Sequence, residues 1–211
     1  MSNYYNWKEK INESELKEVI EILKNDGIII FPTETVYGIG GNALSNKVID
    51  RVYKVKQRPR AKAVNIMVSN INEIKKYAEI KSELEEKIIK NCMPGPITLI
   101  LKKKENFGDY FTANNDTIGV RIPDNKIISA ILKNIDFPII APSANISGKP
   151  SGVELSDIIT DFENEVDAII DGGKANLGLA STIIQVIDGK INILRQGKIS
   201  EEEILNKIQG L

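Results

Sequence analysis

Apolar positions along the chain follow two periods in alternation, and this alternation predicts an α/β fold. The first stripe has the spacing of one helix face and consists of Leu16, Val19, Ile20 and Leu23. Asn12 with Glu15 predicts the capped start of that helix, and Gly27 predicts its end. Residues 28–31 form an apolar run typical of a buried strand, which Pro32 stops. Strands that alternate with helices in this way indicate a central sheet with helices packed on it.

The remaining pattern predicts further strands and helices along the whole chain. The strands are expected at 63–68, 97–102, 117–121, 138–141, 168–171, 182–187 and 191–194, and the helices at 45–55, 71–78, 82–91, 126–134, 154–162 and 200–208. Asp188-Gly189 is a typical hairpin turn between the last two strands, so the sheet should mix antiparallel with largely parallel pairing. We therefore expect one domain over residues 1–211, with about the first ten residues peripheral.

Composition adds the expectation of a soluble protein. The 42% hydrophobic content suffices for a buried core, while the apolar runs are far shorter than the roughly 20 residues that span a bilayer. The N-terminus, MSNYYNWKEK, lacks the apolar stretch of a secretory signal, and the single Cys92 cannot form an internal disulfide. We therefore expect a cytoplasmic protein without a membrane contact.

Two absences restrict the chemistry. The chain has no histidine, which excludes a Ser-His-Asp triad, a histidine base and a histidine metal ligand. A single cysteine also excludes a zinc site built from several thiolates. With 28 basic and 29 acidic residues the net charge is −1, so no overall field attracts the chain to nucleic acid. Catalysis must come from carboxylates, Lys and Arg, hydroxyls, backbone amides and any metal ion that a substrate carries.

Two loops in the first third of the chain combine polar groups that a core does not need. Residues 32–38, PTETVYG, follow a buried strand, where threonine hydroxyls suit a polar ligand but equally satisfy their own turn. Residues 54–62 carry five cations at alternate positions, which would share one face if the segment were extended. Pro59 favours extension at Arg58. Such a cluster is either a phosphate site or a solvated basic edge.

Two later loops offer small groups that can approach a phosphate closely. Residues 141–152 hold hydroxyls, an amide and glycines after a predicted strand, without the Walker A spacing. Residues 171–182 are also rich in glycine and end in Ser181-Thr182, while Arg195 lies near a glycine at the end of the last predicted strand. Each of these loops, taken alone, also fits an ordinary surface turn.

Seven blocks in order make the chain resemble the YrdC/TsaC family of threonylcarbamoyl-AMP synthases. The blocks are PTETVYG at 32–38, K-x-R-P at 56–59, PGPITLIL at 94–101, VRIPD at 120–124, PSANISGKPS at 142–151, DGG at 171–173 and ST at 181–182, with Arg195 after them. The resemblance covers about residues 15–205 and is to the short, single-domain form. It implies a YrdC-like twisted, mixed sheet flanked by helices, with an open, positively lined cleft.

The resemblance also implies a reaction and its partners. L-Threonine, bicarbonate and ATP would give threonylcarbamoyl-AMP, pyrophosphate and water, with Mg²⁺ carried by ATP and no metal site in the protein. Proteins of the TsaD, TsaB and TsaE type would then transfer the threonylcarbamoyl group to the adenosine beside the anticodon of ANN-decoding tRNAs, forming threonylcarbamoyladenosine (t6A). A direct contact with tRNA is a further expectation.

By the same resemblance, two groups of residues form the site. Thr35, Arg121, Ala141 and Ser181 would hold threonine, and Lys56, Arg58, Lys62, Thr117, Ser143, Asn145, Ser151 and Arg195 would hold ATP. Lys56 and Arg58 are the expected catalytic pair, because they would stabilise phosphate charge as a carbamate attacks ATP. The chain departs from the family pattern at Met67, where many members have a histidine, at residues 62–64, and at Gln196, where a proline is common.

Two other functions fit part of the sequence. A non-catalytic module that binds tRNA or double-stranded RNA would explain the basic segment, although the net charge and the hydroxyl-rich loops do not favour it. Another carbamoyl transferase would explain the motifs, because related domains adenylate carbamoyl groups, although they are usually fused to further domains. Threonine- and bicarbonate-dependent pyrophosphate release from ATP separates the three hypotheses.

Overall fold

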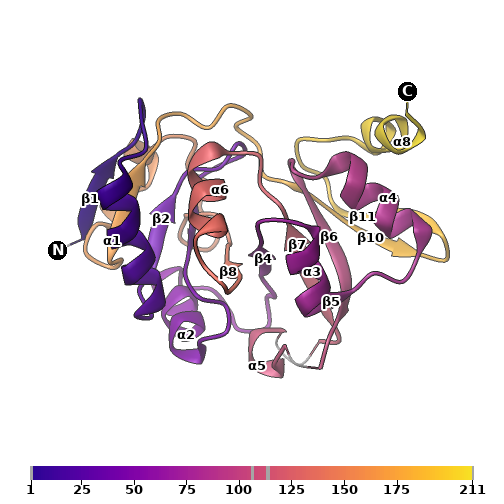
Figure 1. The fold of residues 1–211 in the computed structure, drawn as a ribbon, viewed down its shortest axis with the longest axis horizontal. Helices are drawn as coiled ribbons and strands as arrows, with labels where there is room; N and C mark the ends of the chain where they lie inside the picture. Colours follow the sequence, from indigo (N-terminus) through magenta and orange to yellow (C-terminus); the bar gives the residue numbers. More distant parts are fainter. Residues whose placement is uncertain (1, 106, 113–114, 211) are drawn as a thin grey trace.

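The computed structural model describes residues 2–105, 107–112 and 115–210, which form two mixed β-sheets surrounded by helices (Figure 1). The smaller sheet has the order β1 (Asn3–Asn6), β9 (Ala168–Asp171), β2 (Ile29–Phe31) and β3 (Gly38–Gly40). The larger sheet has the order β11 (Lys190–Arg195), β10 (Thr182–Ile187), β6 (Ile97–Lys103), β7 (Thr117–Arg121), β4 (Asn65–Met67) and β8 (Ile139–Ile140), and β5 (Ala78–Glu79) pairs with β6.

Both sheets combine parallel and antiparallel pairs, which confirms the predicted mixed pairing, but the strands are divided between two sheets. Strand β9 is parallel to β1 and β2, and β10 is parallel to β6, whereas the β10–β11 hairpin is antiparallel. The sheets meet where β3 runs beside β8, with the Ile140 N–H donating to the Gly41 carbonyl at 3.0 Å. Gly40 permits this approach, because a Cβ at this position would lie 1.7 Å from the Ile140 carbonyl oxygen.

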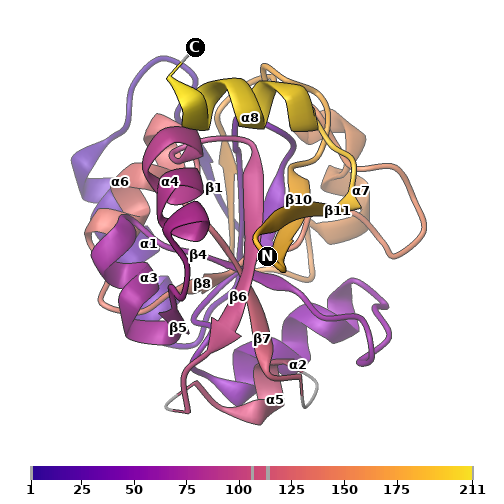
Figure 2. The ribbon, with the colours of Figure 1, turned by 90° about the vertical axis from the view of Figure 1, so that its right-hand side faces the viewer.

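Most predicted helices are present, and the caps predicted at the starts of the first and last helices are found, although the first helix ends at Lys24, before the predicted Gly27. The helices are α1 (Glu13–Lys24), α2 (Asn46–Val55), α3 (Ile71–Tyr77), α4 (Glu83–Cys92), α5 (Asp109–Thr112), α6 (Lys126–Lys133), α7 (Ile159–Phe162) and α8 (Glu201–Gln209). The Asn12 side chain caps α1, and Ser200 with Glu203 forms the capping box of α8. Figure 2 shows α8 lying across the end of the larger sheet beside α4. No helix in the described ranges is long and apolar enough to cross a membrane.

Three parts of the sequence prediction need correction. The helix expected over 154–162 is a 3-10 turn (Leu155–Asp157) followed by the single turn of α7, because Ile158 leaves helical geometry at φ −131°. The short elements β3, β5 and α5 were not predicted. Strand β1 was not predicted either: it forms the edge of the smaller sheet, and the following Trp7 is fully buried with its Nε1 donating to Glu15 at 2.6 Å.

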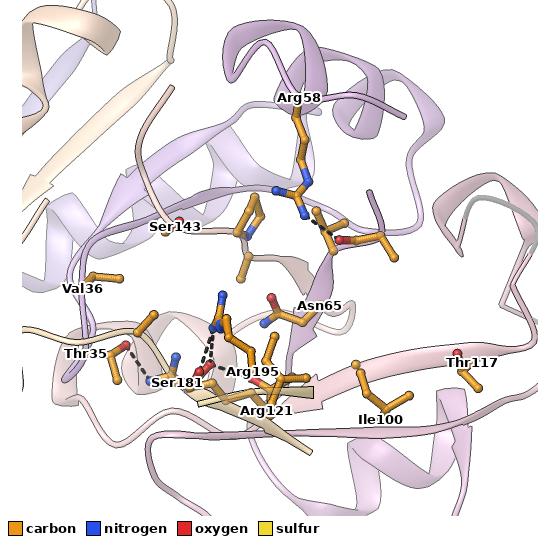
Figure 3. A pocket seen from close by; sticks show the side chains of 18 residues that line it. Thr35, Val36, Arg58, Asn65, Ile100, Thr117, Arg121, Ser143, Ser181 and Arg195 are labelled. Atoms are coloured by element: carbon orange, nitrogen blue, oxygen red, sulfur yellow. Dashed lines mark hydrogen bonds between the residues drawn. The ribbon is translucent and has the colours of Figure 1, made fainter. Parts of the chain in front are cut away.

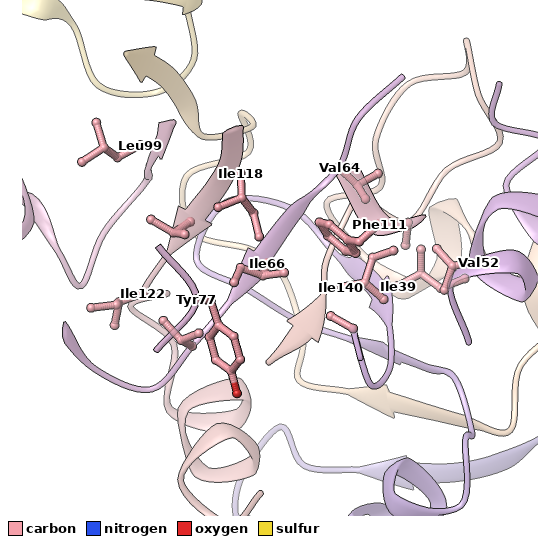
Figure 4. Packing of buried hydrophobic residues seen from close by; sticks show 14 of the residues in the cluster. Ile39, Val52, Val64, Ile66, Tyr77, Leu99, Phe111, Ile118, Ile122 and Ile140 are labelled. Carbon is pink, nitrogen blue, oxygen red and sulfur yellow. The ribbon is translucent and has the colours of Figure 1, made fainter. Parts of the chain in front are cut away.

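Part of the larger of two apolar clusters lies on one face of the larger sheet, because side chains alternate between the two faces of each strand. Leu99 and Leu101 on β6, with Ile118 and Val120 on β7, are almost completely buried in the larger apolar cluster. Figure 4 shows Leu99, Ile118 and Ile66 packed in this layer. The residues between them on the same strands therefore point to the opposite face, and that face carries the candidate site.

Candidate active site

A cleft lies on the face of the larger sheet opposite the apolar core. Its floor is built by Thr98 and Ile100 of β6, Thr117 and Gly119 of β7, and Asn65 of β4. Ile100 and Asn65 both pair with Gly119 in the strand register, on opposite sides of it. A Cβ on Gly119 would lie 3.2 Å from side-chain atoms on each side, so glycine keeps the floor open. The period of two thus explains why polar and small residues alternate with core residues here.

Loops from both sheets form the rim of the cleft. The β2–β3 loop contributes Thr35, residues 141–143 follow β8, and residues 180–181 precede β10. The empty space above these residues, which is open to solvent, is about 870 Å³. Three arginines face it, Arg58, Arg121 and Arg195, and no acidic side chain lines it within the described residues. Such a lining fits an anionic ligand.

Arg58 and Arg195 point toward one another across the cleft (Figure 3), and both donate to neutral acceptors. Arg58 donates from Nε to the Lys62 carbonyl at 3.1 Å and from Nη2 to the Ala63 carbonyl at 2.7 Å. Arg195 Nη2 donates to the Ser181 carbonyl at 2.7 Å. Burial first, and then the charges of Arg121 and Arg58, lower the pKa of the Arg195 guanidinium. The two arginines therefore keep charges that repel each other until an anion enters.

Arg121 differs from these two arginines because a carboxylate touches it. Its Nη2 donates to Thr35 Oγ1 at 2.9 Å and lies 2.7 Å from Glu34 Oε1. Both members of this ion pair are buried. Thr33 Oγ1 lies 2.8 Å from Thr35 Oγ1 and donates to the Val36 carbonyl at 2.6 Å, so the hydroxyls of this loop partly satisfy their own turn. The structure therefore shows the turn-stabilising role of these hydroxyls, while Thr35 also lines the cleft.

Lys56 lies behind the rim of the cleft and not among its lining residues. Its side chain is only 1% exposed, and Nζ lies 2.5 Å from both the Ser143 and the Asn145 carbonyl oxygens, to which it donates. Burial, with a smaller contribution from the charge of Arg58, lowers the pKa of the Lys56 ammonium to about 7. Lys56 thus supports the loop that presents Ser143.

The five cations of residues 54–62 do not share a face, which corrects the expectation of an extended segment. Helix α2 continues through Val55, and Gln57 then takes a left-handed conformation at φ 50° that turns the chain. Arg60 lies between the rings of Tyr53 and Tyr110, with its Cζ 4.7 and 4.5 Å from their centroids. Of the five cations, only Arg58 lines the cleft.

Most of the residues assigned to the site by resemblance lie together in the cleft. These are Thr35, Arg58, Thr117, Arg121, Ala141, Ser143, Ser181 and Arg195. Asn145 accepts a hydrogen bond from Ser143 Oγ at 2.5 Å and donates to the Lys149 carbonyl, so it shapes the loop behind the rim. Lys62 and Ser151 do not line the cleft either, while Met67 pairs with Arg121 in the strand register.

Several residues of the site were not predicted. Asn65, Thr98 and Gly119 carry a detectable signal, because each is a polar or small residue next to apolar residues of its strand, whereas Ile100 is itself apolar and carries none. Glu34 was expected only as one of the polar groups of the 32–38 loop that suit a ligand, and its ion pair with Arg121 has no signal in the sequence. Within the described part of the chain, no group of three or more His, Cys, Asp or Glu side chains could hold a metal ion.

The fold and the cleft define a class of α/β protein in which an arginine-lined site lies on the polar face of a mixed sheet. The model of the Sua5/YciO/YrdC family, described as telomere recombination, matches residues 21–197. The chain belongs to this family.

Relatives in two archaea extend the similarity to nearly the whole chain. A protein of Methanocaldococcus jannaschii, provisionally named threonylcarbamoyl-AMP synthase, is 41% identical over 199 residues, which are 92% of this chain and 93% of the relative. The threonylcarbamoyl-AMP synthase of Pyrococcus abyssi is 35% identical over 97% of this chain. The crystal structure of Pyrococcus abyssi Sua5 complexed with L-threonine superposes with a TM-score of 0.93 at 34% identity, covering 99% of this chain. This chain spans about 60% of the length of the Pyrococcus abyssi protein.

Proposed function

We propose that the chain is an L-threonylcarbamoyladenylate synthase, which converts L-threonine, bicarbonate and ATP into threonylcarbamoyl-AMP, pyrophosphate and water. The observation that carries the proposal is one cleft with two kinds of arginine. Arg58 and Arg195 offer uncompensated charge that suits the phosphates of a nucleotide, whereas Arg121 lies with Thr35 in a setting that suits the carboxylate of an amino acid. The names of the relatives, and the threonine complex of the Pyrococcus abyssi protein, support this choice over an RNA-binding module.

The proposed chemistry needs no nucleophile from the protein. The threonine amine attacks the carbon of bicarbonate, water leaves, and a carbamate results. A carbamate oxygen then attacks the α-phosphorus of ATP, the bond from that phosphorus to the β-phosphate oxygen breaks, and pyrophosphate leaves with its Mg²⁺. This scheme suits a chain without histidine, because positioning and electrostatic stabilisation supply the catalysis.

The residues of the cleft take the following roles in this proposal. Arg58 stabilises charge on the phosphates during transfer, and Arg195, Ser143 and Thr117 bind the nucleotide. Thr35, Arg121, Ala141 and Ser181 bind threonine. Lys56 and Asn145 act through the loop that carries Ser143, which they hold from behind. Lys62 and Ser151 keep a nucleotide-binding role only if their loops close on ATP.

The product would serve the pathway expected from the family resemblance. In that pathway, proteins of the TsaD, TsaB and TsaE type transfer the threonylcarbamoyl group to ANN-decoding tRNA in the cytoplasm. A direct contact between the chain and tRNA belongs to the same proposal. The cleft supports only the synthesis of the adenylate, because the charges of Arg58 and Arg195 suit the phosphates of a nucleotide and Arg121 suits the carboxylate of an amino acid.

Pyrophosphate release from ATP tests the proposal. The purified chain is incubated with ATP, Mg²⁺, bicarbonate and L-threonine, and each component is omitted in turn. We expect release only in the complete mixture, together with an adenylate that contains threonine by mass spectrometry. Release without threonine or bicarbonate would overturn the proposal. No release, together with salt-sensitive binding of tRNA, would instead support the RNA-binding module.

A further inference from the structure

The buried carboxylate of Glu34, which contacts Arg121 but does not itself line the cleft, has no part in the proposed chemistry. Glu34 is 7% exposed, and its backbone carbonyl accepts from the Leu177 N–H at 2.9 Å, which fixes the loop. Neither side-chain oxygen has a hydrogen-bond partner among the described residues, although Oε1 lies 2.7 Å from Arg121 Nη2. A buried carboxylate without hydrogen bonds costs stability, so its presence at this position needs an explanation.

Glu34 makes the two ends of the cleft electrostatically different. Arg58 and Arg195 donate to neutral carbonyl groups, and within the described residues Glu34 is the acidic side chain that contacts an arginine of the cleft. The amino-acid end is therefore close to neutral as a pair, whereas the other end is cationic. Figure 3 shows Arg121 beside Thr35, on the side of the cleft away from Arg58.

A neutral pair of opposite charges suits a ligand that also carries both charges. A free amino acid has a carboxylate, which Arg121 can bind, and an ammonium group, which a bare arginine would repel. The Glu34 charge offsets that repulsion, and burial limits its screening by salt. A simple carboxylate gains nothing from Glu34, because the same charge weakens its attraction to Arg121.

We propose that Glu34 is a specificity-determining residue that acts through Arg121, so that the amino-acid end of the cleft accepts a zwitterion in preference to a simple carboxylate. This inference rests on the proposed function, because it takes L-threonine as the ligand of that end. It assigns Glu34 to selection of the substrate and leaves the transfer step to the arginines and the loops.

Binding of L-threonine and of (R)-3-hydroxybutyrate, which is the same molecule without its amine, tests the inference. Dissociation constants are measured by isothermal titration calorimetry for the wild type and Glu34→Gln. We expect the wild type to prefer threonine at least tenfold and Glu34→Gln to lose tenfold or more of that preference. Thr35→Val, which removes a hydrogen bond to Arg121 without changing charge, should weaken both ligands in proportion.

Two further variants separate charge from structure. Glu85→Gln is the matched control, because Glu85 is a buried glutamate at the start of α4, outside the cleft, and should leave the preference unchanged. Glu34→Asp keeps the charge and should retain an intermediate preference, which carries the test if Glu34→Gln does not fold. An unchanged preference in both Glu34 variants overturns the inference, while a wild type that binds no threonine overturns the proposed function.

Discussion

The two ends of the cleft hold arginines in opposite settings, although the same sheet supports both. Arg58 and Arg195 donate to backbone carbonyl groups and keep their full charge, whereas Arg121 lies against the Glu34 carboxylate. This difference shows that the net charge of a site cannot be inferred from the number of its arginines alone. What each guanidinium touches decides whether it suits a polyanion or a ligand with both charges.

The largest expected effect comes from removing a charge at the phosphate end. Arg58→Ala should lower the rate of threonine-dependent pyrophosphate release by about a hundredfold, or about 3 kcal/mol, because a contact to developing phosphate charge is lost. Steady-state kinetics with ATP as the varied substrate measures this. Lys54→Ala, which removes an exposed charge one turn earlier, is the matched control and should retain activity. Near-normal turnover of Arg58→Ala would remove Arg58 from its proposed role.

A smaller and more selective effect is expected at the amino-acid end. Arg121→Lys keeps the positive charge but loses the planar fork that can bind a carboxylate through two hydrogen bonds. The KM for L-threonine should rise about tenfold, or about 1.4 kcal/mol, while the KM for ATP stays within a factor of two or so. Kinetics with each substrate varied in turn measures the two constants. A parallel rise in both would show that the two ends do not act separately.

Sequence periodicity accounts for the fold and for the floor of the cleft better than for its charges. Alternation along β6 and β7 separates Leu99 and Val120 in the core from Thr98 and Gly119 in the cleft, and local side-chain direction alone decides this. The proximity of Thr35 and Arg121 was expected from family resemblance, and the structure brings them to 2.9 Å. The periodicity of the sequence cannot predict that contact, because the contact depends on how the two sheets join.

The basic segment, residues 54–62, shows why the placement of the charged residues could not be predicted. Alternating cations suggested one extended face, but the apolar stripe of α2 extends the helix to Val55, and Gln57 then reverses the chain. Packing of the helix outweighs repulsion between exposed charges, because each charge finds its own partner or solvent. Pro59 restricts its own φ and the residue before it, so it did not determine the path of residues 54–57.

The pH dependence of stability tests the buried setting of Lys56. Its pKa in the folded protein, about 7, lies below its ordinary value of 10.5. The folded protein therefore binds fewer protons between these values, and the free energy of unfolding should rise with pH across this window. The penalty is fully present below pH 7. Relative to Lys56→Met, the wild type should gain up to about 1.4 kcal/mol per pH unit above pH 7, measured by urea unfolding. If the difference in unfolding free energy between the wild type and Lys56→Met did not change with pH, the hydrogen bonds to the two carbonyl groups would offset the cost of burying the charge.

The smallest expected effect lies outside the cleft, at Arg60. Its guanidinium is held between Tyr53 and Tyr110 and pairs with Asp50, so it fixes the turn that carries Arg58 against α2. These contacts are partly exposed, and each is worth about 1 kcal/mol or less. Arg60→Ala should therefore raise the KM for ATP a few-fold and leave the KM for threonine unchanged, because only the phosphate end depends on this turn. Arg60→Lys keeps the charge and part of the stacking, so its KM for ATP should lie between those of the wild type and Arg60→Ala. If Arg60→Ala changed the threonine constant as strongly as the ATP constant, the turn would serve both ends, and the division of the cleft into a charged and a neutralised end would fail.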